Sequence, residues 1–319
     1  MKFAVISGFA GRIQDRFCTY HEPKTLREKI ATIASVPGIN GIEAIYPHDF
    51  SDRGLLKEAL AEFGMGVSAV NLNLKSDPCY HRGSLTSESP ETRRRAVGDV
   101  KAAMEAAREI GASRISACLL ADGHDYPFEV DYAKHWNWLV EGVREGAADA
   151  KDITLSIEYK LAETRARTVV GTAYKAMLLA KDTGLPNVGV TIDVGHAIWA
   201  IETPAQSLAM LAEHKIPFYV HLNDNYGDWD WDMMPGSVNP LSLIEFFHYL
   251  KRYGYEDWLT FDVFPSRMDA ADCFDQSMKF VDFLRTAADR ISEEDLIELR
   301  AVEDVPAIMG LLRQAAYRS

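Results

Sequence analysis

Short apolar runs alternate with amphipathic segments eight times along this chain, and this alternation restricts the fold more than any other feature. The runs are rich in β-branched residues, as in buried strands, and the segments between them carry apolar residues at helical spacing. We predict strands at 3–7, 41–46, 67–72, 114–119, 153–159, 188–193, 218–223 and 258–264. Eight successive strand–helix units predict an α/β protein with a single (β/α)₈ barrel.

The predicted barrel occupies residues 1–291, and residues 292–319 predict a C-terminal helical extension that is interrupted at Pro306. This extension either covers the floor of the barrel or docks on another subunit. The alternative fold is a doubly wound open sheet, which usually has a Gly-rich phosphate turn after its first strand. The segment 7–11 reads SGFAG and lacks that pattern, so a dinucleotide site has little support.

Composition excludes several classes of protein. The chain has 34 Lys and Arg against 47 Asp and Glu, a formal charge of −13, which argues against nucleic acid as a partner. No apolar run is long enough to span a membrane, and the N-terminus lacks the pattern of a signal peptide. The four cysteines form no CxxC pair, so we expect free thiols in a cytoplasmic protein.

Polar side chains recur at matched positions near the ends of the last four predicted strands. Three of these strands contain a Ser or Thr, then a large apolar residue, then a carboxylate, and the remaining strand has a histidine in that place. Because side chains alternate across a strand, each of these residues shares one face with the Ser or Thr. The matched residues are Glu158, Asp193, His221 and Asp262, and Lys160 lies on the same face as Glu158.

In a barrel, these four side chains would point inward near the carboxyl ends of consecutive strands. Three carboxylates crowded in an interior cannot all stay charged without a cation. Three oxygen donors and one imidazole, with no thiolate, favour Mn²⁺ or Mg²⁺ and also admit Co²⁺. The sequence therefore predicts a divalent metal held by Glu158, Asp193, His221 and Asp262.

A second group of metal-ligand residue types follows the first. His196 lies three residues beyond Asp193, so Asp193 could contact two cations. The segment 228–232 places Asp228, Asp230 and Asp232 at alternate positions, where an extended chain would present them on one side. We predict a second metal held by His196 and two of these three aspartates.

These motifs resemble the xylose isomerase-like TIM-barrel superfamily, whose members carry one ligand on each of the last four strands. The resemblance covers the predicted barrel and is nearest to xylose isomerase and L-rhamnose isomerase. The Glu-x-Lys at 158–160 and the acid-x-x-His at 193–196 match motifs of those isomerases. The segment 221–237, with its Asp-rich loop and Gly-Ser, is similar to the rhamnose isomerase pattern.

The resemblance implies roles for individual residues. Lys160 would assist at the terminal oxygen of the substrate, beside the catalytic carboxylates Glu158 and Asp262. Counting back from the Gly-Ser at 236–237 places Asp230 and Asp232 on the second metal. His48 matches a ring-opening histidine by position only, as it follows the predicted strand 41–46.

The resemblance also implies a reaction, the metal-dependent interconversion of an aldose and a ketose by a hydrogen shift between C1 and C2. The sugar could be a pentose, a deoxyhexose or a branched pentose such as apiose. The alternatives are a ketose 3-epimerase of the D-tagatose 3-epimerase type and a barrel that binds a sugar or metal without turnover. Such epimerases usually carry Glu on the eighth strand, so Asp262 favours the isomerases. Relatives are often homo-oligomers, so we expect a dimer or a tetramer.

Overall fold

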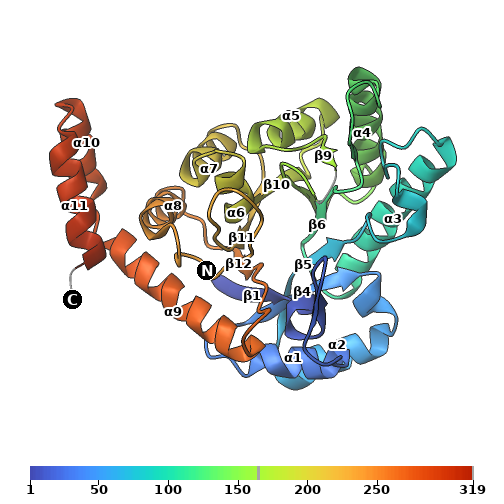
Figure 1. Ribbon diagram of the computed structural model, residues 1–319, viewed down its shortest axis with the longest axis horizontal. Coiled ribbons are helices and arrows are strands. Elements are labelled where there is room, and N and C mark those ends of the chain that lie inside the picture. The colour runs from blue at the N-terminus through green and yellow to red at the C-terminus, as the bar shows by residue number, and fades with distance from the viewer. Residues whose placement is uncertain (164–165, 318–319) are drawn as a thin grey trace.

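The computed structural model describes residues 1–163 and 166–317 and shows a closed parallel barrel surrounded by helices (Figure 1). Its strands follow the order β1-β12-β11-β10-β8-β6-β5-β4, and β4 closes the barrel by pairing with β1. The bounds are β1 Lys2–Ile6, β4 Gly41–Tyr46, β5 Gly66–Leu72, β6 Arg114–Cys118, β8 Thr154–Glu158, β10 Val188–Asp193, β11 Phe218–Leu222 and β12 Trp258–Phe261. The predicted (β/α)₈ barrel is confirmed, and the eight strands lie at the predicted places.

Amphipathic helices follow the strands and form the outer ring of the barrel (Figure 1). They are α1 Leu26–Ala34, α2 Arg53–Phe63, α3 Pro90–Glu109, α4 Tyr132–Ala147, α5 Ala173–Thr183, α7 Pro204–Glu213, α8 Pro240–Arg252 and α9 Ala270–Asp289. Side chains fix several helix starts. Ser89 accepts a hydrogen bond from the Thr92 amide at the start of α3, where Pro90 has no amide hydrogen to satisfy.

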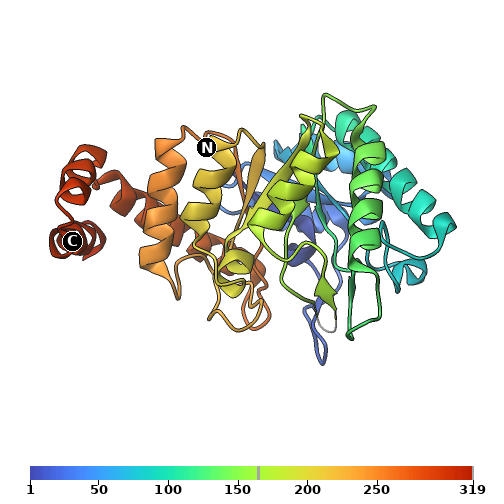
Figure 2. The same ribbon diagram turned by 90° about the horizontal axis from the view of Figure 1, so that it is seen from above.

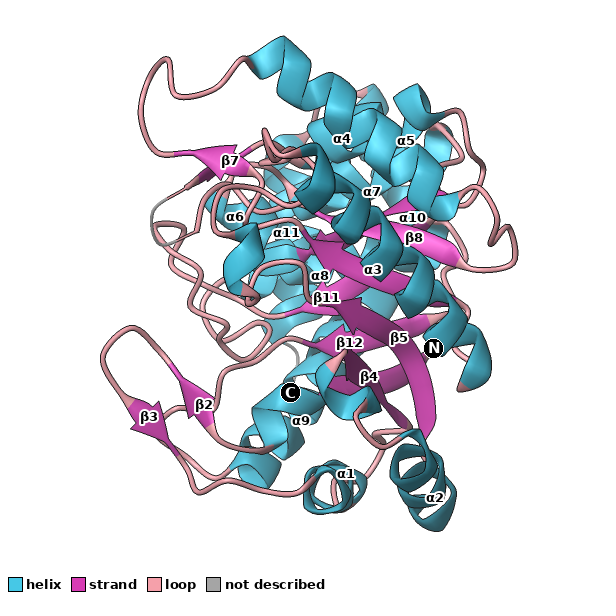
Figure 3. Cartoon of the chain, turned by 90° about the vertical axis from the view of Figure 1, so that its right-hand side faces the viewer, coloured by secondary structure: helices cyan, strands magenta, loops and turns pink. Residues whose placement is uncertain are grey.

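Several short elements follow the carboxyl ends of the strands. After β1 come a 3₁₀ turn (Ser7–Ala10) and the hairpin of β2 (Ile13–Gln14) with β3 (Thr19–Tyr20). β7 (Gly123–His124) pairs with β9 (Arg167–Thr168), and a short helix, α6 (Val194–Trp199), follows β10. Figure 3 shows β2, β3 and β7 at the same end of the barrel. Barrel enzymes keep their chemistry at this end.

Two further helices, α10 (Glu293–Ala301) and α11 (Val305–Tyr317), follow the barrel. They lie outside the ring of helices, with α11 against α8 and α9, and do not cover the floor of the barrel (Figures 1 and 2). Glu293 ties α10 to the barrel, because its carboxylate contacts His248 at 2.7 Å and Arg252 at 3.0 Å.

A layer of hydrogen-bonded polar side chains crosses the interior of the barrel, and we call it the hydrogen-bonded cross-section. Such barrels usually pack branched apolar side chains there. The Tyr219 hydroxyl lies at its centre and contacts Glu43, Ser68 and Thr260, all fully buried. These residues come from β4, β5, β11 and β12, so side-chain hydrogen bonds link opposite walls of the barrel. The apolar core lies mainly between the strands and the surrounding helices.

Two expectations from composition, on membrane-spanning segments and on the cysteines, can be compared with the structure. Within residues 1–163 and 166–317, we find no helix with the length and apolar character that a bilayer span requires. All four cysteines are free thiols in the structure, with Cys18 exposed and Cys118 and Cys273 buried.

Candidate active site and metal centre

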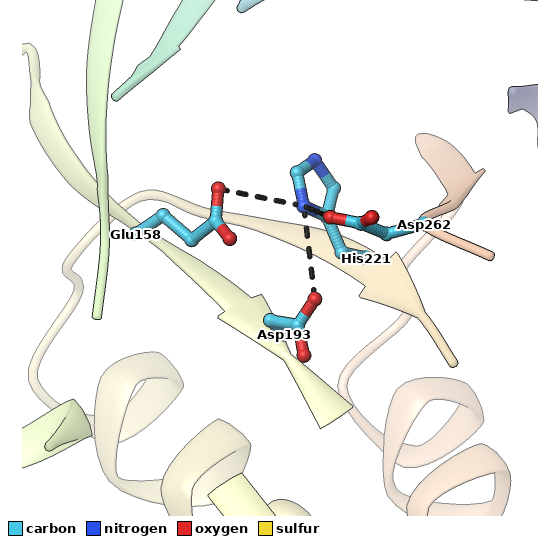
Figure 4. Close-up of side chains that lie close together, drawn as sticks. All are labelled: Glu158, Asp193, His221 and Asp262. Atoms are coloured by element: carbon cyan, nitrogen blue, oxygen red, sulfur yellow. Dashed lines mark ion pairs between the residues drawn. The ribbon is translucent and has the colours of Figure 1, made fainter. Parts of the chain in front are cut away.

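The four ligands predicted from the sequence come together at the carboxyl ends of β8, β10, β11 and β12 (Figure 4). One ligand atom from each of Glu158, Asp193, His221 and Asp262 lies within 4.8 Å of all the others. The His221 Nδ1 atom is 3.6 Å from Glu158 Oε2, 3.9 Å from Asp193 Oδ2 and 3.4 Å from Asp262 Oδ2. We call these four residues the ligand cluster.

Strand register and local hydrogen bonds hold the ligand cluster in place. Asp193 pairs with His221 across β10 and β11, which brings their side chains to the same level. Asp193 also caps α6, since its Oδ1 accepts a hydrogen bond from the His196 amide at 2.8 Å. Its other oxygen accepts from the Asn223 side-chain amide at 2.9 Å. Both oxygens of this carboxylate are therefore fixed.

Burial and nearby charges shift the pKa values of the carboxyl groups in the ligand cluster. Burial raises the pKa of Asp193 to about 7, and the negative charges of Asp262 and Asp230 add to this despite the opposing charge of His196. Burial also raises the pKa of Glu158, but the nearby imidazoles of His221 and His196 outweigh it and lower the pKa to about 2. The metal-free cluster therefore holds protons that a bound cation would displace.

The residues present fit a divalent cation. The Nδ1 atoms of His196 and His221 are buried and have no hydrogen-bond partner in the described part of the chain. The Nδ1 atom of His196 faces Glu158 Oε1 at 3.4 Å and Asp193 Oδ1 at 3.7 Å. Neither nitrogen makes a hydrogen bond to the carboxylates that it faces, so a cation between them would satisfy both groups. The donor set of three carboxylates and one imidazole suits Mn²⁺ or Mg²⁺.

A second group adjoins the ligand cluster through His196. Its Nε2 atom lies 3.2 Å from Asp230 Oδ2, and the same oxygen lies 2.7 Å from Lys160 Nζ. Asp232 approaches this group, with its Oδ1 3.4 Å from the Asn223 side-chain amide, and has a positive φ of 46°. Such a backbone is strained for a residue other than glycine and often occurs at functional sites. Asp228 instead is exposed and accepts a hydrogen bond from the Trp231 indole.

Residues of both groups line one cavity of about 820 Å³. Glu158, Lys160, His196, Asp230, Asp232 and Asp262 form its polar wall. The two long loops at 75–87 and 120–130 also contribute, for example with Lys75, Tyr80 and His81. The cavity is large enough for an open-chain monosaccharide.

His48, which the sequence places near the site, lies next to the wall of the cavity. His48 is exposed and lies 3.5 Å from Asn73, which lines the cavity, whereas His48 itself is not among its described lining residues. The adjacent Asp49 turns away from His48 and accepts hydrogen bonds from the Ser7 hydroxyl and the Ile45 amide. Trp229 and Trp231 line a neighbouring hollow of about 660 Å³, which also includes Asp230 and Asp232.

Several residues that support the site were not predicted from the sequence. Glu43 on β4 contacts the far nitrogen of His221, and Asn223 holds Asp193. Asp122 binds the loop at 75–87 by accepting hydrogen bonds from the amides of Ser84 and Thr86. Glu43 had a detectable signal, since it is the single charged residue in the apolar run 41–46.

We expect divalent metal affinity to fall as the pH drops from 8 to 6. Burial raises the pKa of Asp193 to about 7, and nearby carboxylates outweigh the burial of His196 and raise its pKa to about 9. Metal ligands must lose their protons, so affinity changes roughly tenfold per pH unit for each proton released. Titration calorimetry with Mn²⁺ in two buffers of different ionisation enthalpy measures this release. Equal heats in both buffers and a flat pH profile would contradict it.

Comparisons with known proteins agree with the barrel fold. The family model of xylose isomerase-like TIM barrels matches residues 30–286. A probable sugar isomerase of Mesorhizobium japonicum is 28% identical over 262 residues, which cover 76% of this chain and 58% of that protein. Xylose isomerase of Thermus thermophilus is 26% identical over 219 residues, covering 67% of this chain and 57% of the enzyme. The matched regions thus span less than two thirds of either relative.

A solved structure of an L-ribulose 3-epimerase is similar over 93% of this chain and 98% of that one, with a TM-score of 0.73 and 21% sequence identity. At this identity the likeness shows the fold alone. The family model covers most of the chain, and its barrel is the one that the structure shows. The chain therefore belongs to the xylose isomerase-like TIM barrel family.

Proposed function

We propose that the protein is a divalent-metal-dependent sugar isomerase, which interconverts an aldose and a ketose by a hydrogen shift between C1 and C2. The observation that carries this proposal is the position of Lys160, whose Nζ atom lies 2.7 Å from Asp230 Oδ2 and which lines the same cavity as Glu158 and Asp262. A fixed ammonium beside a metal site suits a reaction in which charge develops on a sugar oxygen. The sugar isomerase relatives support the reaction class.

Glu158, Asp193, His221 and Asp262 would hold the metal, Mn²⁺ or Mg²⁺ with Co²⁺ as a further candidate. His196, Asp230 and Asp232 would hold a second one. When bound, a divalent cation supplies Lewis-acid stabilisation of negative charge on substrate oxygens. The carboxylates Glu158 and Asp262 are exposed to the cavity and orient the sugar hydroxyls that approach the cluster.

Lys160 is the candidate hydrogen-bond donor to the terminal oxygen of the substrate. Its side chain is only 11% exposed, and its Nζ atom lies 2.7 Å from both Asp230 Oδ2 and Glu163 Oε2. Burial lowers its pKa, but these two carboxylates outweigh burial and raise the pKa well above the usual range. Lys160 therefore keeps its proton at neutral pH and can stabilise an oxygen that becomes negative during the reaction.

His48 stays our proposal for ring opening, and its contact with the cavity-lining Asn73 is what supports this role. We further propose a small sugar as the partner, a cytoplasmic location and a homo-oligomer, either a dimer or a tetramer. Size-exclusion chromatography with light scattering measures the last of these.

The alternative is a ketose 3-epimerase, and one observation favours it. Within the ligand cluster, Glu158 and Asp262 come from the ends of β8 and β12 and lie on either side of His221, as an acid–base pair would. Epimerisation needs two groups that exchange a proton with C3 from opposite faces. Asp262 is one methylene shorter than the glutamate usual in such epimerases, and we therefore rank the isomerase first.

We expect metal removal to abolish turnover and Mn²⁺ to restore it. The protein is stripped with EDTA and then assayed with Mn²⁺ on aldotetroses, pentoses, deoxyhexoses and branched pentoses, with ketose formation as the signal. Conversion of an aldose supports the isomerase and names its substrate class. Interconversion of two ketoses without aldose formation would select the epimerase instead. Tight metal binding without either product would favour the third alternative, a barrel that binds a sugar or metal without turnover.

A further inference from the structure

A glutamate in the barrel interior lies behind the histidine ligand. Glu43 sits in the middle of β4 and is fully buried, at 0% exposure. Its Oε2 atom is 3.0 Å from His221 Nε2, across the barrel from β11. A register shift between β4 and β5 occurs at Ile42 and Glu43, and such irregularities often redirect a side chain near an active site.

The carboxylate of Glu43 is surrounded by hydrogen-bond donors. The Asn71 side-chain amide donates to Oε1 at 2.8 Å, and the Tyr219 hydroxyl donates to Oε2 at 2.7 Å. A buried carboxylate with such partners is an acceptor. The third partner, His221 Nε2, must then be the nitrogen that carries a proton.

The other nitrogen of His221 faces the opposite way. Its Nδ1 atom has no hydrogen-bond partner among the residues that the structure describes, and it points at the three carboxylates of the ligand cluster. A neutral imidazole has one protonated nitrogen and one lone pair, so a proton fixed on Nε2 leaves the lone pair on Nδ1. Only a lone pair can bind a cation.

We propose that Glu43 is a positioning residue, which fixes the proton of His221 on Nε2 and thereby presents Nδ1 to the metal. This inference rests on the proposed function only through the presence of a metal at the ligand cluster. Carboxylates behind ligating histidines raise metal affinity in this way in many metalloproteins. A purely structural Glu43 would satisfy Tyr219 and Asn71 without influencing which nitrogen of His221 is protonated.

Glu43→Gln tests the proposal with little change in shape. The glutamine amide can donate to Nε2, which shifts the proton to Nδ1 and removes the lone pair from the metal side. We expect Mn²⁺ affinity, measured by calorimetry, to fall roughly 10- to 100-fold. Tyr219→Phe is the matched control, because it removes a different hydrogen bond to the same carboxylate and leaves His221 in contact. A loss in Tyr219→Phe as large as in Glu43→Gln would overturn the proposal.

Long-range ¹H–¹⁵N NMR of the imidazole gives a readout that does not depend on activity or on the stability of a variant. In the wild-type protein loaded with diamagnetic Zn²⁺, we expect His221 to carry its proton on Nε2 and to bind through Nδ1. The metal-free protein at alkaline pH should show the same neutral tautomer. A proton on Nδ1 in that spectrum would overturn the proposal. Failure of the wild type to bind any divalent metal would instead refute the proposed function, and the alkaline spectrum would still decide the role of Glu43.

Discussion

Glu158→Gln should reduce turnover by about 10³-fold or more, because it removes a charged oxygen ligand from the centre of the site. Glu158 contacts both imidazoles of the site, His221 at 3.6 Å and His196 at 3.4 Å. Its loss therefore weakens metal binding and unbalances the charges around both histidines. Steady-state assays at saturating Mn²⁺, together with calorimetry for affinity, measure the two effects.

Asp228→Asn is the matched control for this variant. Asp228 lies in the same Asp-rich loop as Asp230 but is exposed and bonded to Trp231, outside the ligand cluster. The two substitutions change the formal charge equally, so a general electrostatic effect would appear in both. Full activity of Glu158→Gln, or equal losses in both variants, would refute a metal-centred mechanism.

Lys160→Met should lower kcat by roughly 10²- to 10³-fold with a much smaller change in KM. The ammonium of Lys160 would act on a charge that develops only during the reaction, so its loss affects the transition state more than the bound sugar. The substitution also leaves Asp230 without its cationic partner at 2.7 Å. Measuring kcat and KM separately for the best aldose checks the prediction.

Lys160→Arg separates charge from position. It keeps a cation beside Asp230 but changes the shape and reach of the donor. We expect it to retain the Mn²⁺ affinity of the wild type and to recover only part of kcat. If both variants lose kcat/KM equally, and only because KM rises, Lys160 acts in substrate binding and not in the chemical step.

The sequence predicted much of the barrel and the ligand cluster because both depend on short-range periodicity. Strand alternation determines which side chains face inward, and each strand–helix unit places the next strand beside the previous one. Glu158, Asp193 and His221 could therefore be aligned without coordinates. Asp262 follows directly after β12, so the predicted strand was too long there, yet its side chain reaches the cluster.

Contacts between distant segments could not be predicted in this way. The approach of Asp230 to Lys160 depends on the loop after β11, where Asp232 adopts a positive φ that no local pattern indicates. Glu43 lies 178 residues from His221 in the sequence, and only the closure of the barrel brings the two together. Trp229 and Trp231 line the neighbouring hollow, and the conformation of the same loop places them there.

The hydrogen-bonded cross-section of the barrel also limits how this protein can be altered. An apolar interior tolerates exchanges of similar volume, because dispersion contacts have little directionality. Here the Tyr219 hydroxyl meets three polar partners at once, and a methyl group in place of any one leaves a buried donor or acceptor unmatched. Each such mismatch costs about 1–3 kcal/mol. Engineering of a new specificity is thus better confined to the loops at 75–87 and 120–130, with the barrel interior kept as it is.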